Sequence, residues 1–476
     1  MKTILLILNM IFAISFTCHG VALASSTKPD ILIPPERLQY SPLKFQIPRA
    51  EKVALTNGIP LYIAEDHELP LVKLTALIRT GIAHDPSGKE GLADLVGDVL
   101  LTGGTHLLSG DEIDETLAFM AADIDCGVYL EYTLLTFSVL RKDLDRALEI
   151  FASILRNPVF EQEKFATARN LNIEELRRVS DDPQNLAFRT YRKLLYRGDP
   201  RGRLSTFQSL GRIARTDLLN FHRDHFTPGN ILLSVSGDIT GKEALSLLNR
   251  CLGDWQEINA DMKTLTPPQR KTEASLTLLP KETPQSVIIY GHLGPPISSP
   301  DFYPFTVLDF ILGSGGFQSR MFQEIRTNRG LAYSSGSFYQ ARKDYGIFEA
   351  YVFTKAESTA QVLGLIKDLV REFQEKVVGT GELQWATKAI ANNFIFTFKT
   401  ADDVALQQMM LEYKGLPRSF LEEYPGRIAA VGVEDVRRVA ATYLDPHKSV
   451  ILVLGPEKDF DAPLTRFGTV NREDVF

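Results

Sequence analysis

Two stretches of similar sequence decide the fold: "GRIARTDLLNFHRDHFTPGNILLSVSGD" from Gly211 to Asp238, and "GRIAAVGVEDVRRVAATYLDPHKSVILVLGP" from Gly426 to Pro456. Each opens with Gly-Arg-Ile-Ala, continues with a helical pattern, reaches a proline and finishes in an apolar strand closed by glycine. Self-similarity of this kind indicates an architecture built from copies of one unit. The chain is therefore predicted to fold as two similar lobes.

Within each lobe, strand-like runs precede long helical patterns. The runs 72–81, 286–294 and 345–353 are strand-like, whereas 144–157 and 163–179 repeat their apolar residues at helical spacing. Strands and helices are grouped rather than strictly alternating, which favours an α+β fold. We expect two homologous lobes, residues 40–255 and 274–470, each a mostly antiparallel sheet with helices packed on one face, joined by a Pro-rich and Lys-rich linker, 256–273.

Composition excludes several classes of protein. The 476 residues are 44% hydrophobic, enough for two or more cores, and a net charge of -7 without a basic block makes nucleic acid an improbable partner. Residues 1–24 combine Lys2, an apolar run and Ala-Leu-Ala, which is typical of a cleavable signal peptide, and no transmembrane segment follows. We expect a periplasmic protein. Cleavage would remove Cys18, and whether Cys126 and Cys251 pair stays open.

The stretch "GLADLVGDVLLTGGT", 91–105, predicts an amphipathic helix with an unusual polar face. Its leucines and valines recur at helical spacing, while Asp94, Gly97 and Asp98 share the other side. With histidine at 94 and 98 and glutamate at 97, this would be the His-x-x-Glu-His arrangement that holds zinc and a general base.

Three segments resemble the pitrilysin/insulinase family of inverzincin metallopeptidases. They are "RTGIAHDPSGKEGLADLVGDVLLTGGT" (79–105), "ARNLNIEELRRVSDDPQNLAF" (168–188) and "LYRGDPRG" (195–202). The resemblance implies that the zinc-binding histidines are replaced by Asp94 and Asp98, the catalytic glutamate by Gly97, and that the third ligand is Glu175. Without imidazoles and a general base, zinc hydrolysis is not expected. The carboxylates could hold a hard ion such as calcium or magnesium; the alternative is that both aspartates are solvated helix residues.

A second informative stretch is "LGSGGFQSRMFQEIRTNRGLAYSSG", 312–336. Gly313, Gly315 and Gly316 form a turn before a short helix, without the motifs of a nucleotide site. The resemblance implies that Arg326 and Tyr333 reach a catalytic cavity, where they hold a peptide carbonyl and stabilise its oxyanion. The glycine loop would then face bound substrate.

His222 and His225 are a possible metal pair, since they lie three residues apart on a predicted helix. No carboxylate or cysteine pattern nearby completes such a site, so packing is the favoured interpretation.

The resemblance implies a zinc-free subunit of a periplasmic heterodimeric peptidase. Its partner would be a zinc-motif paralogue, its ligand an unfolded peptide, and zinc would be present in the partner rather than in this chain. One alternative is a catalytically silent assembly or peptide-binding protein; another is an independent hydrolase with a different metal.

Overall fold

The computed structural model describes residues 45–256, 265–271 and 273–474. The predicted signal peptide, 1–24, lies outside these residues, as do 257–264 and 272 of the predicted linker. Among the described residues, no helix is both long and apolar enough to cross a membrane.

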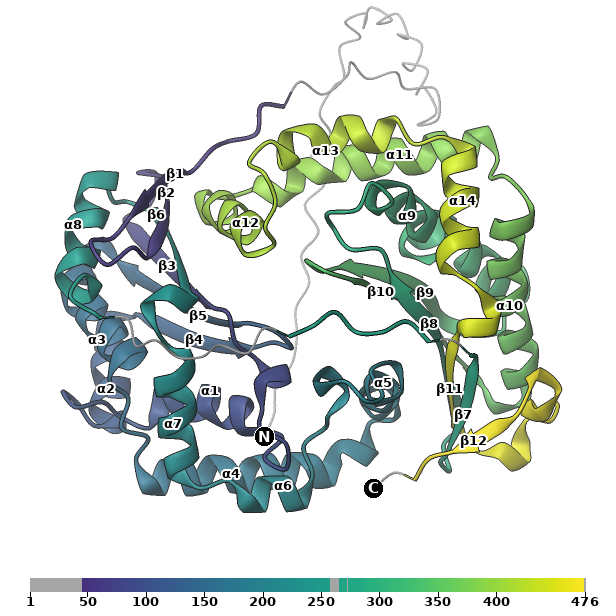
Figure 1. Cartoon of the computed structure of the whole chain (residues 1–476), viewed down its shortest axis with the longest axis horizontal. Helices are drawn as coiled ribbons and strands as arrows, with labels where there is room; N and C mark the ends of the chain where they lie inside the picture. The colour runs from purple at the N-terminus through teal and green to yellow at the C-terminus, as the bar shows by residue number, and fades with distance from the viewer. Residues whose placement is uncertain (1–44, 257–264, 272, 475–476) are drawn as a thin grey trace, which may run out of the picture. The chain divides into compact units, whose positions relative to one another are not determined.

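The first half of the chain forms a six-stranded sheet in the order β1-β2-β6-β3-β5-β4 (Figure 1). Neighbouring strands are antiparallel except for β2 and β6, which are parallel. The strands are β1 (Glu51–Ala54), β2 (Pro60–Glu65), β3 (Leu71–Ile78), β4 (Asp123–Val128), β5 (Thr133–Leu140) and β6 (Ile231–Gly237).

The second half repeats this sheet in the order β12-β7-β11-β8-β10-β9. Here β7 runs parallel to β11 and β12, and the other neighbours are antiparallel. The strands are β7 (Ser275–Pro280), β8 (Gln285–Gly294), β9 (Ala332–Ala341), β10 (Gly346–Lys355), β11 (Val450–Gly455) and β12 (Val470–Arg472). The prediction of two mostly antiparallel sheets in an α+β fold is confirmed.

Helices cover both sheets. Those of the first half are α1 (Leu92–Thr102), α2 (Gly110–Met120), α3 (Leu144–Arg156), α4 (Gln162–Arg178), α5 (Pro183–Leu195), α6 (Phe207–Arg212), α7 (Arg215–His225) and α8 (Gly241–Leu252). Those of the second are α9 (Phe302–Asp309), α10 (Thr359–Glu375), α11 (Thr380–Phe394), α12 (Ala401–Tyr413), α13 (Phe420–Ala429) and α14 (Val433–Tyr443). The sequence repeat is α7 followed by β6, and α14 followed by β11, at equivalent places in the two sheets.

Each sheet has one core formed with helices of its own half. Ile231, Leu233 and Val235 of β6 pack with α1, α3, α7 and α8, and Ile288 and Tyr290 of β8 pack with α9, α10, α11 and α14. Because side chains alternate along a strand, the residues between them point to the opposite face and need a separate cover.

That cover comes from the other half of the chain. Helix α5 packs on β8 and β11, where Tyr191 and Leu194 join Val287 and Leu452 in a third core (Figure 1). Reciprocally, α12 packs on β2 and β6, where Met409 joins other apolar side chains in a fourth. The sequence analysis assigned helices to one face only; the second covered face explains why β6 and β11 are buried along nearly their whole length.

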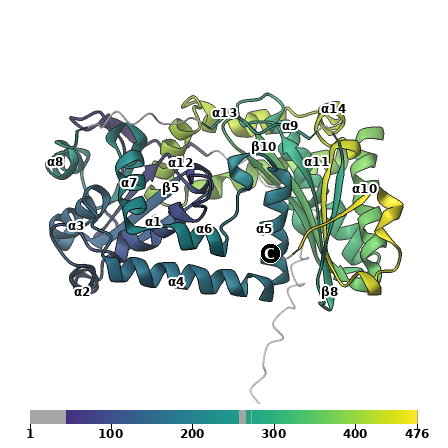
Figure 2. The same cartoon turned by 60° about the horizontal axis from the view of Figure 1, so that its bottom comes forward.

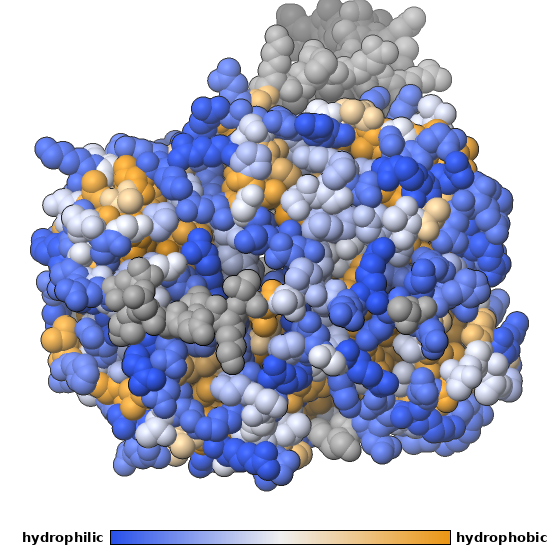
Figure 3. Space-filling view, in the orientation of Figure 1, coloured by the Kyte–Doolittle hydropathy of each residue, from blue (hydrophilic) through white to orange (hydrophobic). Residues whose placement is uncertain are grey.

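The face seen in Figure 3 is mainly hydrophilic, with small separate apolar patches. Large exposed apolar side chains do occur, among them Phe119, Phe317 and Tyr333.

Because α5 of the first half packs on the sheet of the second, Tyr191 should be a major contributor to stability. Tyr191 is fully buried, and its hydroxyl donates to the Val450 carbonyl at 3.4 Å. We expect Tyr191→Ala to lower the free energy of unfolding by about 3 to 5 kcal/mol, measured by urea denaturation. Tyr333→Ala, at a tyrosine that is 80% exposed, should change it by less than about 0.5 kcal/mol. Equal effects of the two substitutions would contradict this role for α5.

Candidate functional site

Helix α1 carries the three positions at which the sequence predicted a vacated zinc motif. Its first N–H groups are satisfied by a residue outside the helix: the Asp85 carboxylate accepts from Gly91 N at 2.7 Å and from Ala93 N at 2.8 Å. Burial nevertheless raises the pKa of Asp85 to about 8. This contact fixes where α1 begins, and therefore where Asp94, in its first turn, lies.

Asp94, Asp98 and Glu175 all line one cavity of about 750 Å³. It is bounded by α1, by the C-terminal part of α4 and by α5, three elements that Figure 2 shows beside α6. The lining residues are Asp94, Asp98, Asn172, Glu175, Leu176, Arg178, Val179, Asn185, Phe188, Arg189, Arg192 and Ser205. The structure thus brings together three of the four predicted positions. The fourth, Gly97, also lies on α1 but faces the strand β4 instead of the cavity.

The two aspartates differ in their surroundings. Asp94 is half-buried, and desolvation together with the nearby Asp98 charge raises its pKa to about 6, against the opposing attraction of Arg192 and Arg189. Asp98 is more exposed and accepts a hydrogen bond from Asn172 at 2.7 Å. Asp94 is thus less accessible to solvent than Asp98, and both line the cavity.

The residues of this site do not fit a zinc ion. No imidazole lines the cavity, and Glu175 is exposed. Throughout the described ranges, no group of three or more histidine, cysteine, aspartate or glutamate side chains is arranged to hold a metal ion. The carboxylates that the sequence suggested for calcium or magnesium share the cavity without forming a ligand cluster.

Arginines of α5 are functional candidates that the sequence analysis missed. Arg189 donates to the Ser205 carbonyl at 2.6 Å and to its hydroxyl at 3.1 Å. Arg192 has one long bond to the Arg203 carbonyl, 3.4 Å, and its buried Nε has no partner among the described residues. Their i, i+3 spacing on a helix capped by Asp182 was visible in the sequence, but the cavity that they enter was not.

Gly97 has a packing role at this site. A Cβ atom placed there would lie 2.5 Å from Cγ2 of Val128 and 3.5 Å from Sγ of Cys126, both on β4. Helix α1 therefore approaches the sheet more closely than any side chain at 97 permits. Cys126 and Cys251 are both free thiols, on β4 and α8, so they do not pair with each other in this structure.

Close packing predicts an unusual sign for a glycine-to-alanine change in a helix. Alanine normally stabilises a helix interior by about 1 kcal/mol relative to glycine. We expect Gly97→Ala instead to lower the free energy of unfolding by about 1 to 2 kcal/mol, because of overpacking against Val128. Gly364→Ala in α10 is the matched control: its nearest contact would be 3.8 Å away, so it should stabilise the protein. Stabilisation by both substitutions would refute the close contact.

Burial of Asp94 predicts a pH dependence of stability. Its pKa of about 6 lies above the ordinary 3.8, so the folded state binds the proton more tightly than the unfolded state does. This contribution to stability is full at pH 4 and is lost as the pH rises through 6. Asp94→Asn should therefore exceed the wild type in unfolding free energy by about 2 to 3 kcal/mol at pH 7 and by little at pH 4, as measured by urea denaturation at both values. A difference independent of pH would contradict this.

Arg326 and Tyr333 lie together in the second half. Arg326 belongs to a π-helical segment, Phe322–Thr327, a wide helical form frequent at functional sites. Its guanidinium carbon lies 4.7 Å from the centroid of the Phe322 ring and 5.3 Å from that of Tyr333. Its guanidinium group makes no hydrogen bond or ion pair with any residue that the structure describes. Two aromatic rings thus hold a guanidinium whose donors are all available.

Neighbouring arginines in the same stretch are already paired. Arg320 forms a bidentate pair with Glu382, at 2.8 and 2.7 Å, and Arg329 pairs with Glu324. Arg326 therefore differs from both: its guanidinium donors are available, whereas those of Arg320 and Arg329 are bonded to carboxylates.

The glycines before this segment have packing reasons of their own. A Cβ at Gly313 would lie 2.3 Å from the Ser337 nitrogen of β9, and one at Gly315 would lie 2.6 Å from the Trp385 ring. Gly316 has a φ of +67° with open space around it, a backbone conformation that favours glycine. The loop needs these residues in order to lie against β9 and α11, whatever it binds.

The predicted histidine pair is packed. His222 is buried, its Nε2 lies 3.0 Å from the Leu155 carbonyl, and burial lowers its pKa to about 4. His225 packs against Phe221 and meets the edge of His84, with ring centroids 5.7 Å apart.

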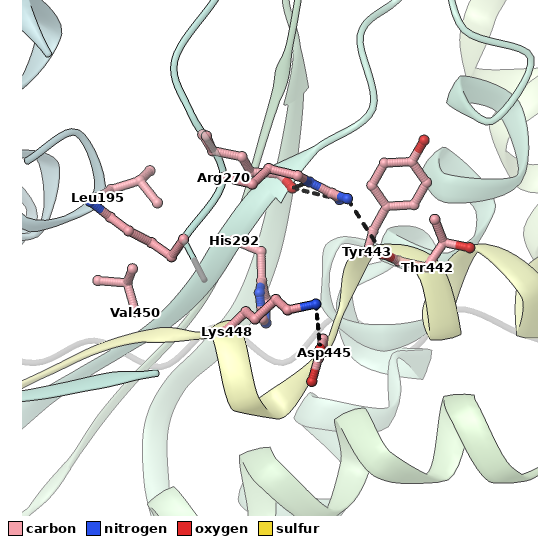
Figure 4. A pocket seen from close by; sticks show the side chains of 10 residues that line it. Leu195, Arg270, His292, Thr442, Tyr443, Asp445, Lys448 and Val450 are labelled. Atoms are coloured by element: carbon pink, nitrogen blue, oxygen red, sulfur yellow. Dashed lines mark hydrogen bonds and ion pairs between the residues drawn. The ribbon is translucent and has the colours of Figure 1, made fainter. Parts of the chain in front are cut away.

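A second cavity, of about 250 Å³, lies between the end of α5, β8 and the end of α14 (Figure 4). Three of its charged groups have partners within it: Arg270 donates to the Leu293 carbonyl at 3.1 Å and stacks on Tyr443, and Lys448 pairs with Asp445 at 3.0 Å. None of the site residues predicted from the sequence lines this cavity.

Comparison with known proteins agrees with this fold. Residues 62–205 match the family model described as insulinase (peptidase family M16), and residues 212–388 match the one described as peptidase M16 inactive domain. The chain belongs to peptidase family M16. It is consistent with a non-catalytic homologue of the zinc proteases in that family.

Relatives include both zinc proteases and a non-peptidase. An uncharacterized zinc protease of Rickettsia felis is 25% identical over 68% of this chain and 78% of its own. The non-peptidase homolog YmxG of Helicobacter pylori is 25% identical over 79% of this chain and 87% of its own.

Solved structures share the fold. The peptidase M16 inactive domain from Pseudomonas fluorescens superposes with a TM-score of 0.79 at 23% identity, covering 90% of this chain and 100% of that one. The periplasmic protease PqqL from Escherichia coli gives a TM-score of 0.73 at 16% identity, covering 94% of this chain but only 49% of its own.

Proposed function

We propose that this chain is the zinc-free subunit of a periplasmic heterodimeric metallopeptidase, in which it binds peptide and stabilises a transition state at the partner's zinc. The observation that carries the proposal is the Arg326 guanidinium, which is held between two rings and has no hydrogen-bonding partner among the described residues. Keeping an arginine in this state without an ion pair is hard to explain by stability alone, because the two neighbouring arginines are paired.

The chemistry of the pair suits an acyl-transfer reaction. Arg326 is always charged and offers several donors, and the exposed Tyr333 hydroxyl offers one more. Directed at one oxygen, they would bind a peptide carbonyl and, more strongly, the oxyanion that develops from it. The general base and the zinc-activated water would come from the partner, since Asp94, Gly97 and Asp98 supply neither.

A longer relative suggests how a partner would be placed. Because 94% of this chain corresponds to only 49% of PqqL, that solved chain is about twice as long as this fold requires. In the proposed heterodimer, a zinc-motif paralogue takes the place of the other half.

Two sheet edges offer a place for the substrate backbone. Among the described strands, β4 and β9 each pair with one neighbour only, so each forms an edge of its sheet. An extended peptide can add to such an edge as a further strand. β4 contacts α1, which carries Asp94 and Asp98, and Tyr333 is the second residue of β9. Both edge strands are therefore close to candidate residues.

Substitution of Arg326 tests this proposal. The mature chain is mixed with a zinc-motif paralogue from the same organism, and hydrolysis of a quenched fluorescent peptide library is followed. We expect hydrolysis only in the mixture, and Arg326→Ala should reduce kcat/KM by about 100- to 1000-fold through loss of an oxyanion donor. Arg329→Ala, which removes a paired arginine three residues away, should change it by less than about threefold.

Other outcomes separate the alternatives. Silence in the mixture, with peptide binding intact, would favour a catalytically silent assembly or peptide-binding protein. Hydrolysis by the chain alone would favour an independent hydrolase that uses another metal, and would overturn the subunit proposal.

A further inference from the structure

The large cavity has walls of opposite charge. Asp94 and Asp98 of α1 and Glu175 of α4 supply the acidic side. Arg189 and Arg192 of α5 supply the basic side, and Arg178, in the last turn of α4, adds a third guanidinium. The acidic and basic side chains in the lining are equal in number, so the cavity is strongly dipolar without a large net charge.

These walls do not neutralise each other by direct contact. Within the described part of the chain, no ion pair joins an acidic lining residue to a basic one, and the Asp94 carboxylate accepts no hydrogen bond. On the basic side, the Nε of Arg192 is buried and has no partner among the described residues. Polar groups left unsatisfied in this way are costly, and a ligand that supplies the missing partners recovers that cost as affinity.

We propose that this cavity binds short peptides by their free ends, with the ammonium group at Asp94 and Asp98 and the terminal carboxylate at Arg189 and Arg192. A zwitterion is the ligand that satisfies both walls at once, whereas a simple anion or cation leaves one wall uncompensated.

The remaining lining suits a peptide between those ends. Phe188, Leu176 and Val179 offer apolar contacts for side chains, and the amide of Asn185 and the hydroxyl of Ser205 can bond to peptide groups. A volume of about 750 Å³ lies within the usual range of small-ligand pockets. Because the walls belong to this chain alone, the proposal holds with or without a zinc-bearing partner.

Blocked peptides test the proposal on the wild-type chain. Isothermal titration compares di-, tri- and tetra-alanine with their N-acetylated, C-amidated and doubly blocked forms. We expect the best-fitting free peptide to bind, each single block to weaken binding by about 10- to 100-fold, and the doubly blocked form not to bind. Absence of binding by all free peptides, or equal binding of free and blocked forms, would overturn the proposal.

Substitutions then assign each end to its wall. Asp94→Asn should abolish the preference for a free amine while keeping that for a free carboxylate, and Arg192→Gln should do the reverse. Arg177→Gln is the matched control, because Arg177 is exposed, pairs with Glu174 and does not line the cavity. Two outcomes would overturn the assignment. One is that either cavity variant, shown to be folded by a cooperative thermal transition, loses both the free-amine and the free-carboxylate preference. The other is that Arg177→Gln loses either preference.

This result is separable from the proposed function. Arg326→Ala should leave the binding of these short peptides unchanged, because Arg326 does not line the cavity. A failure of peptide-end binding therefore leaves the proposal for Arg326 standing, and a failure of hydrolysis in the mixture leaves the cavity proposal standing.

Discussion

The structure depends on a reciprocal exchange of helices between the two halves of the chain. Each sheet has apolar side chains on both faces, and helices of its own half cover only one of them. α5 covers the second face of one sheet and α12 covers that of the other, through cores that neither half could complete alone. The same helix α5 carries Arg189 and Arg192 into the large cavity. The contact that stabilises the fold is therefore also the contact that places the basic wall of the site.

Local signals in the sequence were enough to predict several of the elements. The repeated Gly-Arg-Ile-Ala segments led to two equivalent sheets, and the apolar spacing of Leu144 to Arg156 led to α3. The exchange was beyond such reasoning, because the apolar face of a helix identifies what must be buried and not which sheet buries it. Tyr191 would be buried whether α5 packed on the first sheet or on the second. Only the tertiary structure shows that it packs on the sheet of the second half.

The candidate site was predicted unevenly for a similar reason. Asp94, Asp98 and Glu175 were found through a known motif, and they do share one cavity. Arg189 and Arg192 belong to no motif. They are candidates because they line the same cavity as Asp94 and Asp98, which are far away in the sequence. The partial burial of Asp94 was also hidden, because a polar residue on the outer face of a predicted helix can be covered by another part of the chain. Arg326 was singled out by spacing, but its available donors became visible only beside the paired Arg320 and Arg329.

The contact between Gly97 and Val128 has a consequence for any attempt to rebuild a zinc motif on α1. A glutamate at 97 would begin with a Cβ atom only 2.5 Å from Cγ2 of Val128, a residue of β4. Histidines at 94 and 98 and a glutamate at 97 would therefore not be enough by themselves. The rebuilt motif would also need Val128 to move or to be replaced by a smaller residue.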